Sequence, residues 1–288
     1  MATLNLASSK VDGNMSRLNG RVALVTGGGR GIGLSLTRKL AAEGARVLIN
    51  DLDAAEAEAA ARAIRADGGV AVAFQGNITA NDFPSRFIAA AIREFGDIHI
   101  LVNNAGYIWN GPLHKISDEQ WDAIQNVHLR APFRILRELR GFLEARVAEE
   151  RKAGTIIHRK VVNVSSVSAT GGAAGQANYA AAKAGLHGLT RSLAKEWGPL
   201  AVNVNAVAFG YIETRLTQEI RGETVVTIEG AARRVGLTRP MIEAITQSTA
   251  LGRAGTTDEA AGGILLFCIP ESDYVTGQIL EISGGLAR

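Results

Sequence analysis

One short predicted helix holds two side chains whose spacing suits proton transfer. Residues 175–185 read GQANYAAAKAG, and this alanine-rich run predicts a helix on which Tyr179 and Lys183 share a face. A phenol with an ordinary pKa of about 10 exchanges protons poorly near neutral pH. A neighbouring ammonium favours the phenolate and lowers that pKa, so the pair could act as an acid or a base. The alternative is a solvated pair on the surface.

A glycine-rich turn is a second candidate site, for a phosphate group. Residues 26–33 read TGGGRGIG and join a predicted strand to a predicted helix. They follow the pattern T-G-x-x-x-G-x-G through Gly27, Gly31 and Gly33, and they do not fit G-x-G-x-x-G in any frame. Glycines let the backbone approach a pyrophosphate, which the partial positive charge at the helix start stabilises. A tight structural turn without a ligand is the alternative.

An acidic residue at the end of the next predicted strand bears on which dinucleotide fits this turn. Asp51 ends the apolar run VLIND, where a carboxylate accepts hydrogen bonds from an adenosine ribose and repels a 2′-phosphate. The alternative role of Asp51, as cap of the following helix, suits Asp53 equally well. Arg30 argues for NADP, because a guanidinium beside the phosphates helps to hold it. Repulsion of a dianionic phosphate is hard to offset, so the sequence favours NAD over NADP.

The elements that must position these groups alternate along the chain. Apolar runs without in-and-out alternation indicate a parallel sheet covered by helices on both faces, hence a doubly wound α/β fold. Strands are expected at residues 21–29, 45–51, 70–77, 98–106, 160–166, 202–209 and 277–283. Helices are expected at residues 33–44, 54–69, 82–96, 118–151, 178–185 and 258–269.

One region does not follow this alternation. Residues 217–247 are polar and charged, and glycine and proline interrupt them. A long insertion in a compact domain is often a lid or binding loop, and a surface insertion without function is the alternative. The first residues, 1–18, are expected to form a flexible polar extension, because they lack the apolar core of a signal peptide. Residues 19–288 are expected to form one domain, with 217–247 as a substrate lid.

Composition argues against several classes of protein. The chain has 288 residues, a net charge of +3 and no basic stripe interleaved with aromatic residues, so nucleic acid is not expected as a partner. No run approaches the ~18 uninterrupted apolar residues of a membrane span. The single cysteine, Cys268, forbids an intramolecular disulfide and fits a reducing compartment, so a cytoplasmic location is expected. No metal ligands are assigned.

Four motifs, in this order, resemble the short-chain dehydrogenase/reductase family. They are the glycine turn, NNAG at 103–106, Ser166 thirteen residues before Tyr179, and the Tyr-x-x-x-Lys pair. The resemblance extends from Arg21 to the end of the chain. It implies a single Rossmann-type domain with a seven-stranded parallel sheet and assembly into homotetramers or dimers. It also implies hydride transfer between a nicotinamide cofactor and a secondary alcohol or ketone.

The resemblance assigns roles to individual residues. Tyr179 is the acid or base, Lys183 lowers its pKa and binds the nicotinamide ribose, and Ser166 orients the substrate oxygen. The nearby Ser165 and Ser168 do not have the spacing of the family serine. The cofactor-binding residues implied by the resemblance are Gly27, Arg30, Gly31, Ile32, Gly33, Asp51, Asn77, Ile78, Asn104, Ala105, Gly106, Tyr179, Lys183, Gly210, Ile212 and Thr214.

Three positions depart from the family pattern. His128 stands where an asparagine usually supports a water chain that drains protons from the lysine. A neutral imidazole donates and accepts hydrogen bonds, so His128 either serves in this relay or is merely structural. Phe209 replaces a proline before Gly210, and Asn77 replaces an acidic residue that faces the adenine. The runs NVHL, GQANYAAAKAGL and VLIND together are similar to the hydroxyacyl-CoA dehydrogenase part of peroxisomal multifunctional enzymes, and the chain is also similar to 3-oxoacyl reductases.

The sequence thus predicts an NAD-dependent oxidoreductase that interconverts a secondary alcohol and a ketone. The expected substrate is a small molecule, such as a 3-hydroxyacyl or 3-oxoacyl thioester or a steroid-like alcohol. The alternatives are an NADP-dependent 3-oxoacyl reductase, a nucleotide-sugar epimerase and a non-catalytic dinucleotide sensor. Arg30, in place of the second glycine of the epimerases, argues against an epimerase. Retention of Ser166, Tyr179 and Lys183 together argues against a sensor.

Overall fold

A parallel sheet forms the centre of the fold. The computed structural model describes residues 16–220, 225–228, 231–234 and 236–286. Within these residues, seven strands form one sheet in the order β3-β2-β1-β4-β5-β6-β9, and all adjacent strands run parallel. The strands are β1 (Val22–Thr26), β2 (Arg46–Asp51), β3 (Val70–Gln75), β4 (Ile100–Asn103), β5 (Arg159–Ser166), β6 (Val202–Phe209) and β9 (Ile279–Ile282). The predicted Rossmann-type fold is confirmed, and every strand of this seven-stranded sheet overlaps a predicted run.

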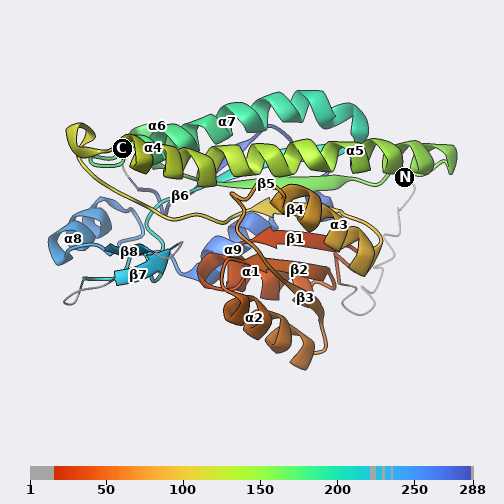
Figure 1. Cartoon of the computed structure of the whole chain (residues 1–288), viewed down its shortest axis with the longest axis horizontal. Coiled ribbons are helices and arrows are strands. Elements are labelled where there is room, and N and C mark those ends of the chain that lie inside the picture. The colour runs from red at the N-terminus through yellow and green to blue at the C-terminus, as the bar shows by residue number, and fades with distance from the viewer. Residues whose placement is uncertain (1–15, 221–224, 229–230, 235, 287–288) are drawn as a thin grey trace, which may run out of the picture.

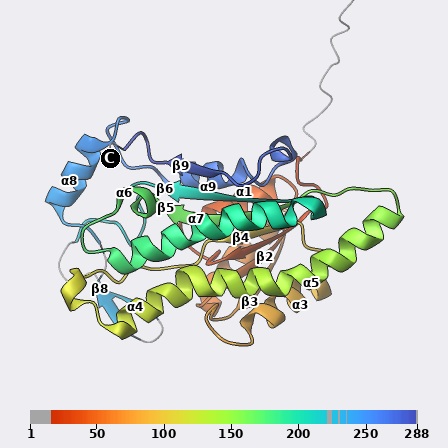
Figure 2. The same ribbon diagram turned by 90° about the horizontal axis from the view of Figure 1, so that it is seen from above.

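Helices cover both faces of this sheet, as Figure 1 and Figure 2 show from two directions. One layer contains α1 (Gly31–Ala42), α2 (Ala54–Ala66) and α9 (Thr257–Leu265), and the other contains α3 (Phe83–Phe95), α4 (Asp118–Gln125), α5 (Ala131–Lys152) and α7 (Ala177–Trp197). Each layer buries its own cluster of apolar side chains against the sheet, which is why β1 and β6 are buried along their whole length. No helix in the described residues is long and apolar enough to cross a membrane.

Because the strands are parallel, their carboxyl ends meet at one edge of the sheet. Thr26, Asp51, Asn103, Ser166 and Phe209 end β1, β2, β4, β5 and β6 respectively. The chain leaves β1 for β2 on one side and returns to β4 on the other, so the strand order reverses between β1 and β4. Open α/β sheets bind ligands beyond the carboxyl ends at such a reversal. The fold therefore gathers the predicted site residues at this edge.

The long helix predicted at 118–151 is interrupted by a π-helical turn. α4 begins at a capping box, in which the Ser117 hydroxyl accepts a hydrogen bond from the Gln120 amide over 3.2 Å. Residues Asn126–Arg130 form the π turn that joins α4 to α5. Such turns inside helices frequently occur at functional sites. This one places His128 in the interior, where the residue is 3% exposed.

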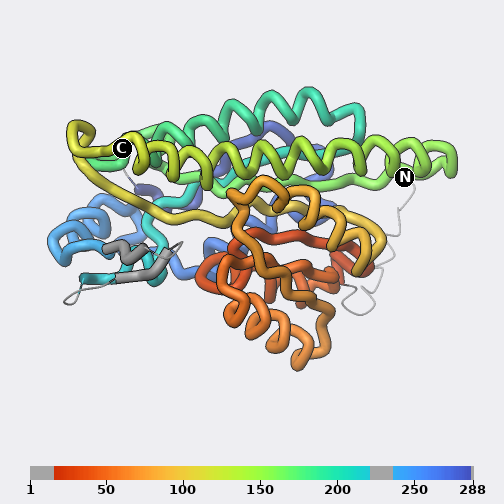
Figure 3. The backbone as a smooth tube through the Cα atoms, in the orientation of Figure 1, coloured from red at the N-terminus to blue at the C-terminus, as the bar shows by residue number. Residues whose placement is uncertain are grey.

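The insertion predicted at 217–247 contains regular elements that the sequence did not indicate. Strands β7 (Val225–Ile228) and β8 (Ala231–Arg234) form an antiparallel hairpin, and α8 (Arg239–Ser248) follows it. In Figure 3 the chain leaves the sheet after β6 and, beyond α8, returns towards α9. Figure 1 and Figure 2 both place the hairpin and α8 beyond the carboxyl ends of the strands. The insertion therefore lies on the side of the molecule that carries the predicted site.

The folded part of the chain begins before the predicted boundary at residue 19. Leu18 is 2% exposed and belongs to the apolar cluster between the sheet and α1. Its amide donates to the Glu43 carbonyl oxygen over 2.8 Å, and Arg17 pairs with the Glu43 carboxylate. Residues 1–15 of the predicted extension lie outside the described residues.

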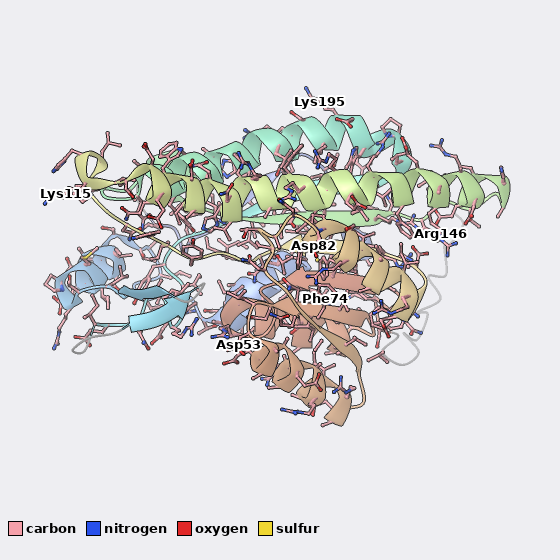
Figure 4. The ribbon with its side chains drawn as sticks, in the orientation of Figure 1. Asp53, Phe74, Asp82, Lys115, Arg146 and Lys195 are labelled. Atoms are coloured by element: carbon pink, nitrogen blue, oxygen red, sulfur yellow. The ribbon has the colours of Figure 1, made fainter. Side chains whose placement is uncertain are left out.

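A buried ionic cluster connects β5 to α5 at the opposite edge of the sheet. The Arg159 guanidinium, 2% exposed, donates to the Glu150 carboxylate over 2.7 Å and to the Asp97 carboxylate over 3.2 Å. Arg146 also pairs with Asp97, and Figure 4 shows it at the end of the molecule away from Lys115. These pairs offset the cost of removing the Arg159 charge from water.

We expect Arg159→Ala to lower the free energy of unfolding by about 3 kcal/mol, because Glu150 would lose its partner in the cluster and Asp97 would keep only Arg146 of its two arginine partners. Urea unfolding followed by circular dichroism measures this change. Arg239→Ala is the control, because Arg239 pairs with Glu243 on the surface and loss of that pair costs at most about 1 kcal/mol. Equal effects of the two substitutions would contradict a stabilising role for the buried cluster.

Candidate active site

Ser166, Tyr179 and Lys183 come together at the carboxyl edge of the sheet. Ser166 is the last residue of β5, and α7 carries Tyr179 and Lys183 one helical turn apart. Ser166 makes a side-chain hydrogen bond with Tyr179, and its Oγ accepts from the Ser168 amide over 3.2 Å. The Ser168 hydroxyl donates in turn to Gln176 Oε1 over 3.1 Å. Ser168 and Gln176 therefore fix the position of Ser166, a role that their sequence positions did not reveal.

Lys183 is held in the interior by a backbone carbonyl. The residue is 4% exposed, and its Nζ donates to the Val164 carbonyl oxygen over 2.6 Å. The same Nζ lies 5.6 Å from the centre of the Tyr179 ring. Burial disfavours the charged ammonium and lowers the pKa of Lys183 to about 7. Lys183 can therefore change its protonation state near neutral pH.

The protein's own groups leave Tyr179 a weak acid. Burial raises the pKa of the phenol to about 12, and the hydrogen bond with Ser166 acts in the opposite direction. The sequence predicted that Lys183 would lower this pKa. Burial outweighs that effect here, because Lys183 donates to Val164 and is itself disfavoured as a cation. Tyr179 is therefore protonated at neutral pH and becomes a base only when further positive charge approaches it.

His128 packs against the phenol as a neutral imidazole. Its ring centre lies 5.0 Å from that of Tyr179, with the planes at 88°. Nε2 lies 2.6 Å from the Tyr107 carbonyl oxygen, and since a carbonyl only accepts, Nε2 carries the proton. Nδ1 is then an acceptor, and it has no hydrogen-bond partner among the described residues. Burial, together with the charge of Lys183, holds the pKa of His128 well below its ordinary value.

Close backbone approaches explain the glycines of this region. A Cβ at Gly33 would lie 2.0 Å from the Gly27 carbonyl oxygen, so only glycine lets α1 pack onto the turn. A Cβ at Gly106 would lie 2.2 Å from Cε1 of His128, so Gly106 makes room for the imidazole. Gly33 thus allows close packing of the turn that could hold the cofactor, and Gly106 allows close packing of His128 beside Tyr179.

The NNAG turn after β4 is locked onto the glycine turn after β1. The Asn104 side chain donates from Nδ2 to the carbonyl oxygens of Thr26 and Gly27, both over 3.0 Å. The Ala105 amide donates to the Thr26 hydroxyl over 3.1 Å. Thr26, which the sequence identified only as part of a motif, is therefore the residue that joins the two turns.

The start of α1 fits a pyrophosphate group. Arg30 is the N-cap residue of α1, and no side chain among the described residues caps the helix. A Cβ at Gly31 would meet no atom within 4 Å, so the space beyond the helix start is open. Ile32, in the first turn, packs its side chain towards the apolar cluster below. Uncapped amides at an open helix start suit an anionic phosphate.

Asp51 and Asp53, at and after the end of β2, have different roles, which the sequence left open. Asp53 caps α2, since its Oδ1 accepts from the Ala55 amide over 3.0 Å. Asp51 is buried, and its carboxylate oxygens accept from the amides of Gly29 and Asp53, each over 3.1 Å. A carboxylate has about four acceptor positions, so Asp51 keeps capacity for ribose hydroxyls. Asp51 is thereby fixed directly against the glycine turn.

Asn77 and Ile78 follow β3 at the same edge. The Asn77 Oδ1 accepts from the amide of Thr79 over 3.0 Å and from its hydroxyl over 2.8 Å. Ile78 is 7% exposed and belongs to the apolar cluster under α3. The Asn77 amide therefore shapes the loop on which the family's acidic residue usually stands, while Ile78 is largely inside the core.

Gly210, Ile212 and Thr214 form the segment that leaves β6. The Gly210 amide donates to the Ile282 carbonyl oxygen over 3.1 Å, which continues the pairing with β9. The Thr214 amide donates to the Thr217 hydroxyl over 2.9 Å, and that hydroxyl donates to the Ile212 carbonyl oxygen over 2.5 Å. Thr217, which had no assigned role, ties this segment to the start of the insertion.

Two further residues position the catalytic helix without any signal in the sequence. The Gln125 side chain, at the end of α4, donates to the Asn178 carbonyl oxygen over 2.9 Å. The Asn178 side chain donates to the Trp109 carbonyl oxygen over 3.1 Å. These partners lie 53 and 69 residues apart in sequence, so no local pattern could reveal them. Together they anchor the start of α7, one residue before Tyr179.

We expect the contribution of Lys183 to stability to rise with pH. Its pKa is about 7 in the folded chain and 10.5 as an ordinary lysine, so the unfolded state binds more protons between these values. Urea unfolding of the wild type and Lys183→Met from pH 7 to 10.5 measures the effect. The difference in the free energy of unfolding, wild type minus variant, should increase by up to about 4 kcal/mol between pH 7 and pH 10.5. A difference that stays constant would contradict a lowered pKa.

Comparison with known proteins agrees with this geometry. A family model described as short chain dehydrogenase matches residues 21–224. The chain is 36% identical to the short-chain reductase protein NovJ of Streptomyces niveus, over 92% of this chain and 93% of that protein. It is 35% identical to the 3-oxoacyl-[acyl-carrier-protein] reductase FabG of Thermotoga maritima, over 94% of this chain and 99% of that protein. A solved variant of a Serratia marcescens short-chain dehydrogenase/reductase superimposes with a TM-score of 0.79 at 28% identity, over 94% of this chain and 100% of that one.

These relatives match this chain over more than nine tenths of its length, and in this chain Ser166, Tyr179 and Lys183 meet at the same edge of the sheet as the glycine turn. An enzyme of this kind is an oxidoreductase that acts on a CH–OH group or a ketone with a nicotinamide cofactor. The chain belongs to the short-chain dehydrogenase/reductase family.

Proposed function

We propose that the chain transfers a hydride between NAD and the carbon of a secondary alcohol or ketone, with 3-hydroxyacyl and 3-oxoacyl thioesters as its substrates. The observation that carries the proposal is the meeting of Ser166, Tyr179 and Lys183 beside a glycine turn that fits a pyrophosphate. Relatives named 3-oxoacyl-[acyl-carrier-protein] reductase support the thioester as substrate class. A steroid-like alcohol has no comparable support among these relatives.

The nicotinamide ring, when bound, supplies or accepts the hydride, and the residues around it handle the proton. In reduction, Tyr179 donates its phenolic proton to the substrate oxygen as negative charge develops there. Ser166 donates a hydrogen bond to the same oxygen and so stabilises that charge. In oxidation, the Tyr179 phenolate takes the proton of the hydroxyl group, and this requires the phenol pKa to fall from about 12.

Lys183 is placed to provide the positive charge for that fall. Its Nζ lies 5.6 Å from the centre of the Tyr179 ring, within the range over which an ammonium stabilises a phenolate. Nζ now donates to the Val164 carbonyl, and we propose that rotation about the end of the side chain brings it towards the phenol or a ribose hydroxyl when the cofactor binds. Lys183 therefore serves both as the electrostatic partner of Tyr179 and as a cofactor ligand.

We propose His128 as the next group in the proton path. Its Nδ1 is a buried acceptor without a partner among the described residues, and such acceptors usually bond to an ordered water. A water bonded to Nδ1 would receive protons from the Tyr179–Lys183 pair and pass them outwards. The bond from Nε2 to the Tyr107 carbonyl fixes the tautomer that this role requires.

The surroundings of Arg30 support NAD over NADP. Its Nη2 lies 3.1 Å from the Asp53 carboxylate and 3.7 Å from that of Asp51, so the guanidinium is already paired. Asp51 is in addition positioned to repel a 2′-phosphate. The alternative, an NADP-dependent 3-oxoacyl reductase, would require Arg30 to leave these carboxylates.

We also propose residues 217–247 as the substrate lid. The hairpin and α8 lie beyond the carboxyl edge of the sheet in Figure 1, directly after the segment that ends at Thr214. Backbone bridges join Glu219 to Leu237 and Thr249 to Leu286, and they fix both ends of the insertion. Assembly into homotetramers or dimers is proposed on the family resemblance alone, and a cytoplasmic location is proposed on the single cysteine, Cys268.

Tyr179→Phe should lower kcat about a thousand-fold, because it removes the group that exchanges the proton with substrate. The Kd for NADH should change less than about three-fold, since the ring and its packing remain. Loss of NADH absorbance with a short 3-oxoacyl thioester measures turnover, and quenching of protein fluorescence measures binding. Substantial turnover by this variant would contradict the assignment of Tyr179, and a variant that binds no NADH would show a structural role instead.

His128→Leu should lower kcat at least about ten-fold with little change in KM, because the relay acts on protons and does not bind substrate. His128→Asn restores the amide that relatives usually carry, and it should retain most of the activity. Steady-state kinetics of both variants with the same thioester check this expectation. If His128→Leu is thermally destabilised but keeps its kcat, the imidazole is structural and the relay is wrong.

A further inference from the structure

A compact ionic cluster surrounds Arg30 at the start of α1. Among the described residues, Nη2 of Arg30 lies 3.1 Å from Oδ2 of Asp53, 3.7 Å from Oδ1 of Asp51 and 3.8 Å from Oε1 of Glu56. Asp51 ends β2, Asp53 caps α2 and Glu56 stands in the first turn of α2. One guanidinium is therefore shared by three carboxylates from a single strand-to-helix connection. Figure 4 shows Asp53 at this connection, at the edge that carries the site.

The backbone makes this arrangement rigid. A Cβ at Gly29 would lie 2.9 Å from the Asp51 carboxylate and 3.0 Å from the Glu56 backbone, so the glycine turn packs directly onto the start of α2. Arg30 follows Gly29 and is consequently held beside the carboxylates. Asp51 is tied by amide hydrogen bonds, and Asp53 is tied by its cap bond to Ala55. Release of Arg30 would thus require the guanidinium itself to move.

A second cation faces the same cluster. Arg215, from the segment after β6, interacts electrostatically with Arg30, Asp51, Asp53 and Glu56. Two guanidiniums and three carboxylates give this group of side chains a net charge of −1. A ribose with free hydroxyls is compatible with that charge, whereas a dianionic 2′-phosphate is not.

We propose that Asp53 and Glu56 determine cofactor selectivity together with Asp51, by holding Arg30 in ion pairs and so denying its guanidinium to a 2′-phosphate. This inference rests on the proposed use of a nicotinamide dinucleotide. Asp51 acts directly, because it meets the ribose position, while Asp53 and Glu56 act through Arg30. Specificity of this kind needs a repulsive element as well as an attractive one, and the three carboxylates provide it.

The test uses isosteric variants of the full chain and measures binding, without any substrate. Asp53→Asn/Glu56→Gln removes two of the three charges, and asparagine caps a helix as well as aspartate does. Fluorescence titrations with NADH and with NADPH give the two dissociation constants. The double variant should bind NADPH about ten-fold more tightly than the wild type, with NADH binding unchanged within about two-fold.

We call the ion pairs that hold Arg30 against Asp53 and Glu56 the Arg30 clamp. Two further variants test whether this clamp, and not a general change of charge, causes the effect. Adding Arg30→Gln to the double variant should abolish the gain in NADPH affinity, because the freed guanidinium causes it. Glu58→Gln is the matched control on α2, since Glu58 pairs with Arg65 at 2.7 Å and not with Arg30. It should leave both dissociation constants unchanged.

The outcomes distinguish this inference from the proposed function. An unchanged ratio of dissociation constants in the double variant would overturn the clamp, and so would a gain that persists without Arg30. Tighter binding of NADPH than NADH by the wild type would instead refute the assignment of NAD. Binding of neither dinucleotide by the wild type would refute the proposed function as a whole.

Discussion

Lys183 is buried and Tyr179 beside it is partly buried, and the cost of keeping a charge away from water governs both. Burial raises the pKa of the phenol to about 12 and lowers that of the amine to about 7, so at neutral pH Tyr179 is protonated while Lys183 exchanges its proton readily. Ser166 and the Val164 carbonyl supply hydrogen bonds to these two side chains. A phenolate therefore forms only when a ligand brings further positive charge, which limits proton exchange to the occupied site.

The rest of the structure positions Tyr179, Lys183 and the groups around them. Parallel strands bring Ser166 to the same edge as the glycine turn, and helices on both faces exclude water from the sheet beneath it. The π-helical turn points His128 inwards, and Gly106 leaves space for the ring against Tyr179. The side chains of Gln125 and Asn178 hold the first turn of α7 in place. Small residues and long-range hydrogen bonds therefore determine the geometry of the catalytic groups.

Local patterns were sufficient to predict much of this architecture. Apolar runs predicted the strands because a sheet covered on both faces needs buried side chains at every position. Helical spacing predicted that Tyr179 and Lys183 share a face, and the family resemblance added Ser166, which the neighbouring β5 brings to the same edge of the sheet. Capping preference offered Asp51 and Asp53 alike as caps of the following helix, and the hydrogen bond from the Ala55 amide shows that Asp53 takes this role.

Other features depend on contacts that no local pattern encodes. The Val164 carbonyl that binds Lys183 and the Tyr107 carbonyl that fixes His128 are backbone groups, which sequence does not distinguish. Burial of Tyr179 reversed the predicted direction of its pKa shift, because desolvation depends on the whole fold. The β7–β8 hairpin was also missed, because the β-branched run Val225–Ile228 is short and stands among charged residues and glycines that read as a loop.

A titration of Tyr179 tests most directly whether this phenol stays protonated until the cofactor binds. Ultraviolet difference titration of the wild type against Tyr179→Phe follows its phenolate among the four tyrosines of the chain. Without added dinucleotide, Tyr179 should give no phenolate signal up to about pH 10, since its pKa is about 12. With saturating NAD, the signal should appear at lower pH, because the positive charges of the nicotinamide ring and Lys183 favour the phenolate. A phenolate that forms near neutral pH without NAD, or a titration that NAD leaves unchanged, would contradict the account.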